Sequence, residues 1–370
     1  MRVALVAPLV SPIAQPYIGG AQALIADLAL GLHKREHNVT LFARAGSVLK
    51  DIEIESINVP ESVRPAIFSA PVNAGHTDAG FFAQANIFLE LFLQLQLRTD
   101  EFDLIHVHAF DWPAYTCSAL IRDIPVLHTL HLPAIAGEIN EALRVLDQQG
   151  HPLILTTVSQ SCARTYADYT PIDYVVYNGL DLEVIPFAPV VAHDAPLLFA
   201  GRISPEKGVE AALEIAERAN YPLIIAGGIY DRDYYEQRIA PRIADSSSRV
   251  TYAGQLEREM LWRQMGQAAA LLCPVAWDEP FGLAPVEAMA TGTPVIAFRR
   301  GAMEEIIRHG ETGFLVEPGE CAQAAALVDD LVDIPRALCR THVEEHFSLA
   351  SMVSEYERVY HEAIWPSPIL

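Results

Sequence analysis

The apolar positions of this chain follow two alternating periods. Short continuous apolar runs, typical of strands buried in a parallel sheet, are separated by longer segments in which apolar residues recur at helical spacing. In residues 21–35, for example, Leu24, Ile25, Leu28 and Leu32 fall on one helical face. This alternation of strands and helices predicts a doubly wound α/β fold with parallel sheets.

The predicted strands fall into two groups. The first comprises residues 3–7, 39–43, 104–107, 125–127, 153–158 and 174–177, and the second comprises residues 197–200, 223–226, 249–252, 269–273 and 294–297. Helices are predicted at 21–35, 85–97, 209–218, 285–291 and 348–363. Between the two groups, residues 183–196 contain three prolines and are predicted to link two domains.

We therefore expect two Rossmann-like domains, residues 1–187 and 188–347, followed by a terminal helical segment at 348–370. In open α/β sheets, ligands bind at the carboxyl ends of the strands, where helix N-termini also point. A cleft between the two domains is consequently the expected ligand site.

Composition argues against several classes of function. The formal net charge of −22 argues against general nucleic-acid binding and against strong docking to anionic lipid. No apolar stretch reaches the roughly 18 residues that a membrane span needs, and the apolar N-terminal run is too short for a signal peptide. We therefore expect a cytoplasmic protein. The five cysteines include no C-x-x-C pair, so neither structural zinc nor a disulfide framework is expected.

The first candidate site is residues 201–208, which follow a predicted strand and precede a predicted helix. Arg202 offers a planar fork of donors, and Lys207, one of three lysines in the chain, offers a compact charge. Together they suit a diphosphate. Because no Gly-Lys-Ser/Thr follows, the segment is not a Walker A loop. The alternative is a solvated turn whose cations pair with Glu206 or Glu210.

A second candidate site precedes the predicted helix at 285–291. Pro285 fits the first turn of that helix, and Gly292 fits its C-terminal exit. Phe281, Gly282 and Leu283 would then present backbone N–H groups at a helix N-terminus, which is a ready anion-binding site.

Two glutamates flank those amides. Glu287, about one turn into the helix, is well placed to accept hydrogen bonds from two ribose hydroxyls. Glu279, before the helix, would lie beside a sugar attached to the bound phosphate. The alternative for both is a surface carboxylate that interacts with the helix dipole.

With these residues in place, the chain resembles the family 4 glycosyltransferases of GT-B fold. The segments that carry the resemblance are residues 201–208, 277–282, 287–297 and 310–316, with weaker matches at 19–20, 158–159 and 178–181. They occur in family order across nearly the whole chain. The resemblance implies two Rossmann-like domains with a cleft between them and a final helix that crosses back onto the first domain.

The resemblance also implies a role for each donor-site residue. Arg202 and Lys207 would hold the donor diphosphate. Glu287 would bind ribose, Glu279 would contact the transferred sugar, and the amides of residues 281–283 would hold phosphate and sugar hydroxyls.

Further residues would complete the donor site. Gly19 and Gly20, at the start of the first long helix, would close over the donor from the first domain. The base would rest near Gly227 and the loop that contains Gln255 and Leu256. No metal or further cofactor is implied beyond the nucleotide sugar itself.

Histidines in the first domain are a separate candidate. His131 follows a predicted strand and, in the family, would lie beside the donor sugar and the acceptor. The alternative is a histidine that caps a strand end. His106 and His108 form an H-x-H pair, but no third ligand is near in sequence, so a structural or acceptor-side role is favoured over a metal site.

The implied activity is retaining transfer from a nucleotide-diphosphate sugar to a hydroxyl. No residue offers itself as the nucleophile that double displacement needs, so front-face substitution is expected. Alternatives are a GT-B epimerase or phosphorylase and a non-catalytic sugar-nucleotide-binding protein. The family resemblance favours a UDP-sugar as the donor, with GDP- and ADP-sugars as the alternatives. The acceptor, whether a small molecule, a glycan or lipid-linked, is expected around residues 111–115 and 133–144.

Overall fold

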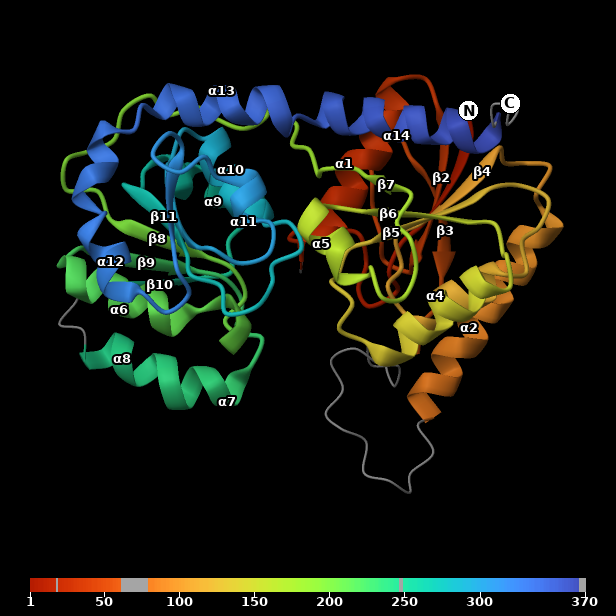
Figure 1. The fold of residues 1–370 in the computed structure, drawn as a ribbon, viewed down its shortest axis with the longest axis horizontal. Coiled ribbons are helices and arrows are strands. Elements are labelled where there is room, and N and C mark those ends of the chain that lie inside the picture. Colours follow the sequence, from red (N-terminus) through yellow and green to blue (C-terminus); the bar gives the residue numbers. More distant parts are fainter. Residues whose placement is uncertain (18, 61–78, 246–248, 366–370) are drawn as a thin grey trace. The chain divides into compact units, whose positions relative to one another are not determined.

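The computed structural model describes residues 1–17, 19–60, 79–245 and 249–365. The chain forms two compact units. Unit 1 comprises residues 1–179 with the C-terminal segment from Leu349, and unit 2 comprises Leu180–Ser348. Each unit has its own parallel sheet with helices against it (Figure 1).

Unit 1 contains a sheet in the order β3-β2-β1-β4-β5-β6-β7, in which every pairing is parallel. Its strands are β1 (Arg2–Val6), β2 (Asn38–Arg44), β3 (Glu53–Ile57), β4 (Leu104–Val107), β5 (Val126–Leu130), β6 (Leu153–Thr157) and β7 (Tyr174–Val175). Its helices are α1 (Gly20–Lys34), α2 (Ala79–Leu97), α3 (Trp112–Ser118), α4 (Gly137–Gln148), α5 (Gln160–Thr165) and α14 (Leu349–Ile364).

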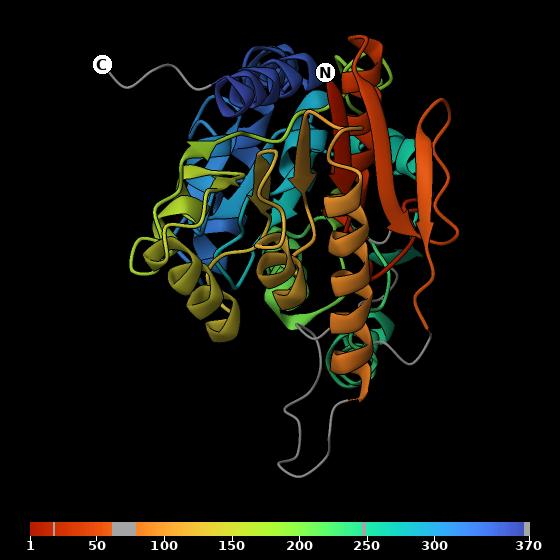
Figure 2. The same ribbon diagram turned by 90° about the vertical axis from the view of Figure 1, so that its right-hand side faces the viewer.

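Strand β1 lies inside the sheet and buries both of its faces. Val3 and Leu5 point to a core shared with α1 and α14, whereas Ala4 and Val6 point to a core shared with α2. This follows from the two-residue period of a strand, which sends successive side chains to opposite faces. Figure 2 shows α2 lying along the sheet of unit 1.

Unit 2 contains a parallel sheet in the order β10-β9-β8-β11-β12-β13. Its strands are β8 (Leu197–Ala200), β9 (Leu223–Ala226), β10 (Val250–Gly254), β11 (Ala270–Cys273), β12 (Val295–Phe298) and β13 (Gly313–Val316). Its helical segments are η2 (Pro205–Lys207), α6 (Val209–Ala219), α7 (Arg232–Tyr234), η3 (Tyr235–Ile239), α8 (Ala240–Asp245), α9 (Arg258–Gly266), α10 (Leu283–Ala290), α11 (Met303–Ile306), α12 (Cys321–Ala326), η4 (Asp329–Asp333) and α13 (Arg336–His346).

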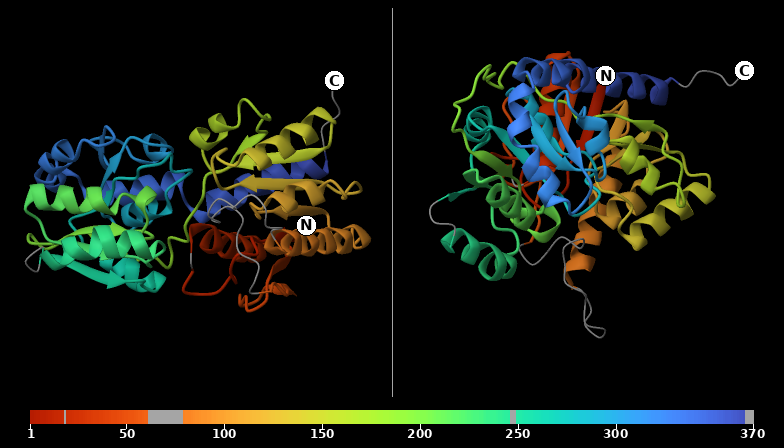
Figure 3. Two further views of the ribbon diagram at one scale, coloured as in Figure 1. Left: turned by 90° about the horizontal axis from the view of Figure 1, so that it is seen from below. Right: turned by 60° about the vertical axis from the view of Figure 1, so that its left-hand side comes forward.

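The helices of unit 2 form two groups. Helix α6 packs with α12, while α10 packs with α9 and α13. Figure 3 shows both groups beside the sheet. The predicted class, a doubly wound α/β fold with two Rossmann-like domains, is confirmed.

Two strands escaped prediction. Strand β3 lies at an edge of its sheet and contains three polar residues among its five, so it lacks the continuous apolar run of an interior strand. Strand β13 is a short edge strand that begins at Gly313. Helix α2 begins at Ala79, six residues before the predicted start at 85.

The two compact units divide between Gly179 and Leu180, several residues before the predicted boundary at 187/188. Residues after Gly179 are hydrogen-bonded to α13 of unit 2. The Leu180 N–H donates to the Phe347 carbonyl at 2.9 Å, and the Arg340 guanidinium donates to the Leu182 and Ile185 carbonyls. The proline-rich segment at 183–196, which was predicted to link the two domains, is therefore attached to unit 2.

The C-terminal helix α14 packs against α1 within unit 1. In the described ranges, no helix combines the length and the apolar character that crossing a membrane would require.

The contact between α1 and α14 yields a stability prediction. A Cβ added at Gly31 would lie 2.7 Å from Val353 Cγ2, and a valine side chain has little freedom to move away. We expect Gly31→Ala to lower the stability of unit 1 by about 1–3 kcal/mol, measured by thermal unfolding. Gly137→Ala is the matched control, because a Cβ there would meet nothing within 4 Å. Equal stability of the two variants would contradict the prediction.

Candidate active site

Two loops of unit 2 meet at the carboxyl ends of the paired strands β8 and β11. Gly208, between η2 and α6, has a φ of +77°, and a Cβ there would lie 1.9 Å from the Pro274 carbonyl oxygen. Only glycine combines this left-handed conformation with so close a backbone approach. The Ala276 N–H donates to the Glu206 carbonyl at 2.9 Å and ties the loops together. Residues 201–208 and 274–282 are thus held at one edge of the sheet.

Lys207 and Glu279 are in direct contact at this edge. Lys207 Nζ donates to Glu279 Oε2 at 2.6 Å, and Trp277 Nε1 donates to the same oxygen at 2.7 Å. The ammonium also lies 5.0 Å from the centroid of the Trp277 ring. The lysine and glutamate side chains are only 18% and 11% exposed, so this pair is shielded from much of the solvent screening that weakens surface ion pairs. The two predicted residues are brought together, although neither had been predicted to bind the other.

Arg202 is held over an aromatic ring. Its guanidinium carbon lies 4.6 Å from the centroid of the Tyr230 ring, which orients the planar fork. Its ion pair with Glu206 is long, at 3.5 Å, and Glu206 also accepts a hydrogen bond from the Ser204 hydroxyl at 2.6 Å. The pairing with Glu206 that was considered as an alternative therefore exists, but its geometry is that of a weak, replaceable contact.

Helix α10 begins beside the Lys207–Glu279 pair. Gly282 precedes its first residue, Leu283, with a φ of +100°, and a Cβ at Gly282 would lie 2.5 Å from Met303 Cε. Because the first N–H groups of a helix lack intrahelical acceptors, this end can bind an anion. Pro285 sits in the first turn, as predicted, where its missing N–H costs nothing.

Glu287 has partners that the sequence analysis missed. Its Oε1 atom accepts hydrogen bonds from Arg258 Nε at 3.3 Å and from Trp262 Nε1 at 3.1 Å. Arg258 and Trp262 lie one turn apart on α9, with the guanidinium 4.8 Å from the indole centroid. That i, i+4 spacing was a readable signal of a shared helix face, but nothing in the local sequence pointed to Glu287 as its partner.

The glycines after β9 bring a further loop to the same edge. Gly227, with a φ of +155°, would place a Cβ 1.8 Å from the Gly201 carbonyl oxygen. Its N–H donates to the Gly254 carbonyl at 2.8 Å, and a Cβ at Gly228 would lie 3.1 Å from Gln255 Oε1. Gln255 is exposed and Leu256 half-buried, so both are at the surface of this edge.

Three predicted site residues belong to unit 1. Gly19 is the N-cap of α1 and Gly20 its first residue, at the carboxyl end of β1. His131 directly follows β5 and is buried, with its Nε2 2.9 Å from Nδ1 of His108. Burial lowers the pKa of His131 to about 4, so the imidazole is neutral at pH 7.

The H-x-H pair does not form a metal site. Both ring nitrogens of His106 are used, since Nδ1 lies 2.6 Å from the Tyr360 hydroxyl and Nε2 lies 2.7 Å from the Thr129 hydroxyl. Across the ranges that the structure describes, no group of three or more His, Cys, Asp or Glu side chains is arranged to hold a metal. The pair instead joins β4 to α14.

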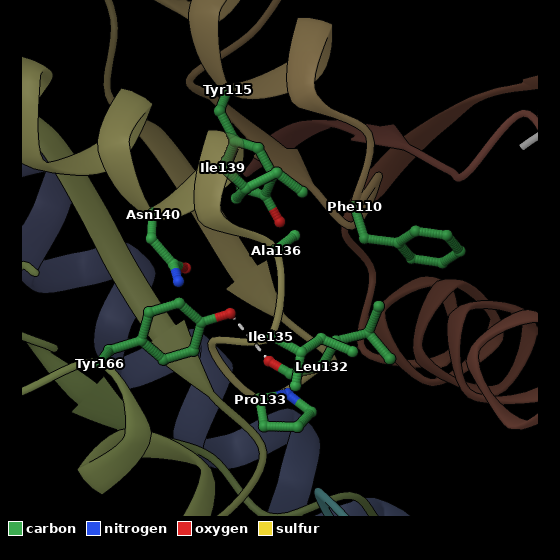
Figure 4. Close-up of a pocket in the computed structure, with 9 residues that line it drawn as sticks. All are labelled: Phe110, Tyr115, Leu132, Pro133, Ile135, Ala136, Ile139, Asn140 and Tyr166. Carbon is green, nitrogen blue, oxygen red and sulfur yellow. Dashed lines mark hydrogen bonds between the residues drawn. The ribbon is translucent and has the colours of Figure 1, made fainter. Parts of the chain in front are cut away.

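A small pocket lies in unit 1, in the region expected for the acceptor (Figure 4). Its lining residues come from the segments after β4, β5 and α5 and from α3 and α4, and they are Phe110, Tyr115, Leu132, Pro133, Ile135, Ala136, Ile139, Asn140 and Tyr166. Phe110 stands on one side, with Asn140 and Tyr166 on the other.

A buried carboxyl group follows Phe110. Asp111 accepts a hydrogen bond from Gln84 Nε2 at 2.8 Å through Oδ1, while Oδ2 is buried without a partner among the described residues. Burial raises the pKa of Asp111 to about 6. At pH 7 a buried, poorly compensated negative charge therefore destabilises unit 1.

Two family models match the chain. Residues 18–184 match Glycosyltransferase Family 4, and residues 188–345 match Glycosyl transferases group 1. The chain is 29% identical to a D-inositol 3-phosphate glycosyltransferase of Mycolicibacterium smegmatis, over 98% of this chain and 91% of that one. It is also 29% identical to the Mycobacterium marinum protein of the same name, with 90% and 78% covered.

Solved structures share the fold. Sucrose-phosphate synthase of Thermosynechococcus elongatus superimposes with a TM-score of 0.78 at 20% identity, covering 99% of this chain and 100% of that chain. HepE of Anabaena, solved with UDP-glucose, gives a TM-score of 0.74 at 19% identity, with 97% and 99% covered.

The two parallel-sheet units and these matches define a glycosyltransferase of GT-B fold. Within that class, the chain belongs to family 4 of the glycosyltransferases. The matches favour sugar transfer over the epimerase, phosphorylase and non-catalytic alternatives, because the relatives are named as transferases.

The Asp111 carboxyl group yields a prediction of pH dependence. Its folded pKa of about 6 exceeds the ordinary aspartate pKa of 3.8, so its contribution to stability is fully present below about pH 4 and is lost as pH rises through about 6. We expect Asp111→Asn to stabilise unit 1 at pH 7.5 by up to about 3 kcal/mol, with the gain shrinking below about pH 5. Thermal unfolding across this range measures it.

Asp103→Asn is a control variant for which we expect the opposite change in stability. Its carboxylate accepts hydrogen bonds from the Arg2 backbone N–H and guanidinium, so we expect this variant to lose stability at pH 7.5. A pH-independent effect of Asp111→Asn would mean that its carboxyl group does not titrate in this window.

Proposed function

We propose that this enzyme transfers a sugar from a nucleotide-diphosphate sugar, with UDP as the favoured nucleotide, to an acceptor hydroxyl with retention of anomeric configuration. The observation that carries the proposal is the Lys207–Glu279 pair beside the N-terminus of α10. A cation, a carboxylate and the N-terminal amides of a helix, all at the carboxyl ends of the strands, can bind a phosphate, sugar hydroxyls and a phosphate oxygen, respectively.

The donor diphosphate would be bound by Arg202, Lys207 and the amides of residues 281–283. Lys207 has three N–H donors, and its bond to Glu279 uses one of them, which leaves capacity for phosphate. Arg202 can exchange its long contact with Glu206 for a bidentate contact with phosphate while its stacking on Tyr230 is kept.

The sugar and nucleoside would extend to either side of the diphosphate. Glu279 would accept hydrogen bonds from hydroxyls of the transferred sugar, and Glu287, oriented by Arg258 and Trp262, would accept them from the ribose. The base would rest by Gly227, Gln255 and Leu256, at the end of β9 and β10. HepE, solved with UDP-glucose, supports UDP as the nucleotide to test first.

Gly19, Gly20 and His131 would act from unit 1. The two glycines at the start of α1 leave room for the donor to approach the backbone. Neutral His131, with its Nε2 beside His108, would contact the transferred sugar and the acceptor through a hydrogen bond and without a full charge. This donor-site arrangement needs no metal or further cofactor.

Retention fits front-face substitution better than double displacement. A covalent route needs a free carboxylate beneath the anomeric carbon, but Glu279 Oε2 already accepts two hydrogen bonds, from Lys207 and Trp277. In the proposed step, the bond between the anomeric carbon and the β-phosphate oxygen breaks with its electron pair. The acceptor oxygen bonds to that carbon on the same face, and its proton passes to the departing nucleoside diphosphate. Arg202, Lys207 and the amides stabilise the charge that grows on the leaving phosphate.

The phosphate role of Arg202 is testable by turnover. We expect Arg202→Ala to lower kcat by about 100- to 1,000-fold, which is the typical loss for one preorganised donor to a developing oxyanion. Release of nucleoside diphosphate measures the rate. Arg218→Ala removes an exposed arginine of the same unit that pairs with Glu214, and it should leave the rate unchanged. Wild-type turnover by Arg202→Ala would refute the assignment.

The nucleotide can be identified by thermal shift. A ligand at about 100 times its Kd stabilises the native state by about 2.7 kcal/mol, so UDP should raise Tm by several degrees. GDP and ADP should give smaller shifts. We expect Glu287→Ala to reduce the UDP shift, because the ribose loses its carboxylate acceptor. A larger shift with GDP or ADP would correct the choice of nucleotide and leave the reaction class intact.

A further inference from the structure

The pocket of unit 1 has a chemical character of its own. None of its nine lining residues carries a charged side chain. Recognition of a phosphate group ordinarily uses arginine or lysine, which supply several donors and a positive charge. The relatives named above are D-inositol 3-phosphate glycosyltransferases, so a pocket without a basic side chain marks a difference in the ligand that it can hold.

Two polar groups face the interior of this pocket. Asn140 is 2% exposed, and its Nδ2 donates to the Ala134 carbonyl at 3.0 Å, which fixes the orientation of the amide. Its Oδ1 is buried and has no hydrogen-bond partner among the described residues. Tyr115, which is also buried, lines the pocket and carries a hydroxyl group. Figure 4 shows both groups directed toward the space that the other side chains enclose.

The unsatisfied Asn140 oxygen points to a ligand that donates a hydrogen bond. A buried acceptor without a partner costs about 1–3 kcal/mol, and a ligand hydroxyl would recover that cost. Because the free atom is an acceptor and no cation is near it in the pocket, the matching group is a neutral hydroxyl and not a phosphate oxygen.

The rest of the pocket favours an apolar group. Phe110, Leu132 and Ile139 contribute apolar walls, and Ile135 stands at the mouth with 62% of its surface exposed. A ring or short alkyl chain placed against Ile135 would remove this apolar surface from water. The pocket also adjoins His131 in the chain, since Leu132 is the next residue.

We infer that this pocket binds the acceptor as a neutral alcohol that carries an apolar ring or chain, with a hydroxyl hydrogen-bonded to Asn140 Oδ1 and to the Tyr115 hydroxyl, and that it rejects phosphorylated polyols. The inference rests on the proposed function for its reaction, which is the transfer step given above. It adds the class of the acceptor and the residues that select it.

A comparison of acceptors tests the inference. With UDP-glucose as donor, we expect phenyl glucoside to be glycosylated with a higher kcat/KM than glucose, and myo-inositol 3-phosphate to be the poorest substrate. UDP release and product mass measure transfer. A preference for myo-inositol 3-phosphate, or donor hydrolysis without transfer to any apolar alcohol, would overturn the inference and leave the donor site standing.

Two variants test whether the preference for an apolar acceptor arises in this pocket. Ile135→Ala should lower kcat/KM for phenyl glucoside by about tenfold, as expected for losing apolar contact with a substrate, and should lower kcat/KM for glucose by a smaller factor. Tyr115→Phe should raise KM for both alcohols, because each loses a hydroxyl contact. Val145→Ala, at an exposed position of α4 outside the pocket, is the control and should change neither. Equal losses for both acceptors in Ile135→Ala would indicate a merely structural role.

Binding measured without donor separates this inference from the proposed function. Calorimetry should show that phenyl glucoside binds the wild-type protein more tightly than it binds the Ile135→Ala variant, whether or not the donor turns over. Absence of UDP-glucose turnover together with this binding difference would refute the proposed reaction alone. Equal binding to both proteins would refute the pocket assignment alone.

Discussion

The close approach of two backbone segments at Gly208 and Pro274 is the constraint on which the candidate donor site of unit 2 depends. The distance of 1.9 Å that a Cβ would have to the Pro274 carbonyl leaves no room for any side chain. The approach places the loop after β8 against the loop after β11, and so brings Lys207 into contact with Glu279, 72 residues later in the chain. A comparable approach of Gly227 to Gly201 adds the loop after β9 to the same edge.

In the candidate donor site of unit 2, the charged side chains make contacts that a ligand can replace or share. Lys207 contacts one carboxylate oxygen of Glu279, and Arg202 stacks on Tyr230. If these cations bind a diphosphate as proposed, their orientation before it arrives would reduce the entropy lost on binding and the reorganisation needed during transfer. Glu287 is oriented in the same way by two donors on α9.

The interior of unit 1 contains a buried hydrogen-bond network of histidine, threonine and tyrosine side chains. His106 binds Tyr360 of α14 and Thr129 of β5, and Thr129 also lies 3.1 Å from the Tyr356 hydroxyl, so the sheet and the C-terminal helix share a buried hydrogen-bond network. Burial lowers the pKa values of His106, His108 and His131, which keeps these imidazoles neutral at pH 7. The network attaches α14 by directional bonds in addition to its apolar face.

The sequence by itself determined the fold class, most strand positions and the segments of the candidate donor site. These depend on signals within about ten residues: the period of apolar side chains, glycine at a left-handed turn, and proline in the first turn of a helix. The edge strand β3 escaped because three of its five residues are polar and it has no continuous apolar run.

Only the tertiary structure decided which side chains meet. The contacts of Lys207 with Glu279, of Arg258 with Glu287 and of His108 with His131 depend on strand order and loop approach, which no local pattern specifies. The boundary after Gly179 was decided in the same way. Prolines predicted a segment that links two domains, and hydrogen bonds from Arg340 attach that segment to unit 2. Local propensity selects the elements, and the partners of buried polar groups follow from how those elements pack.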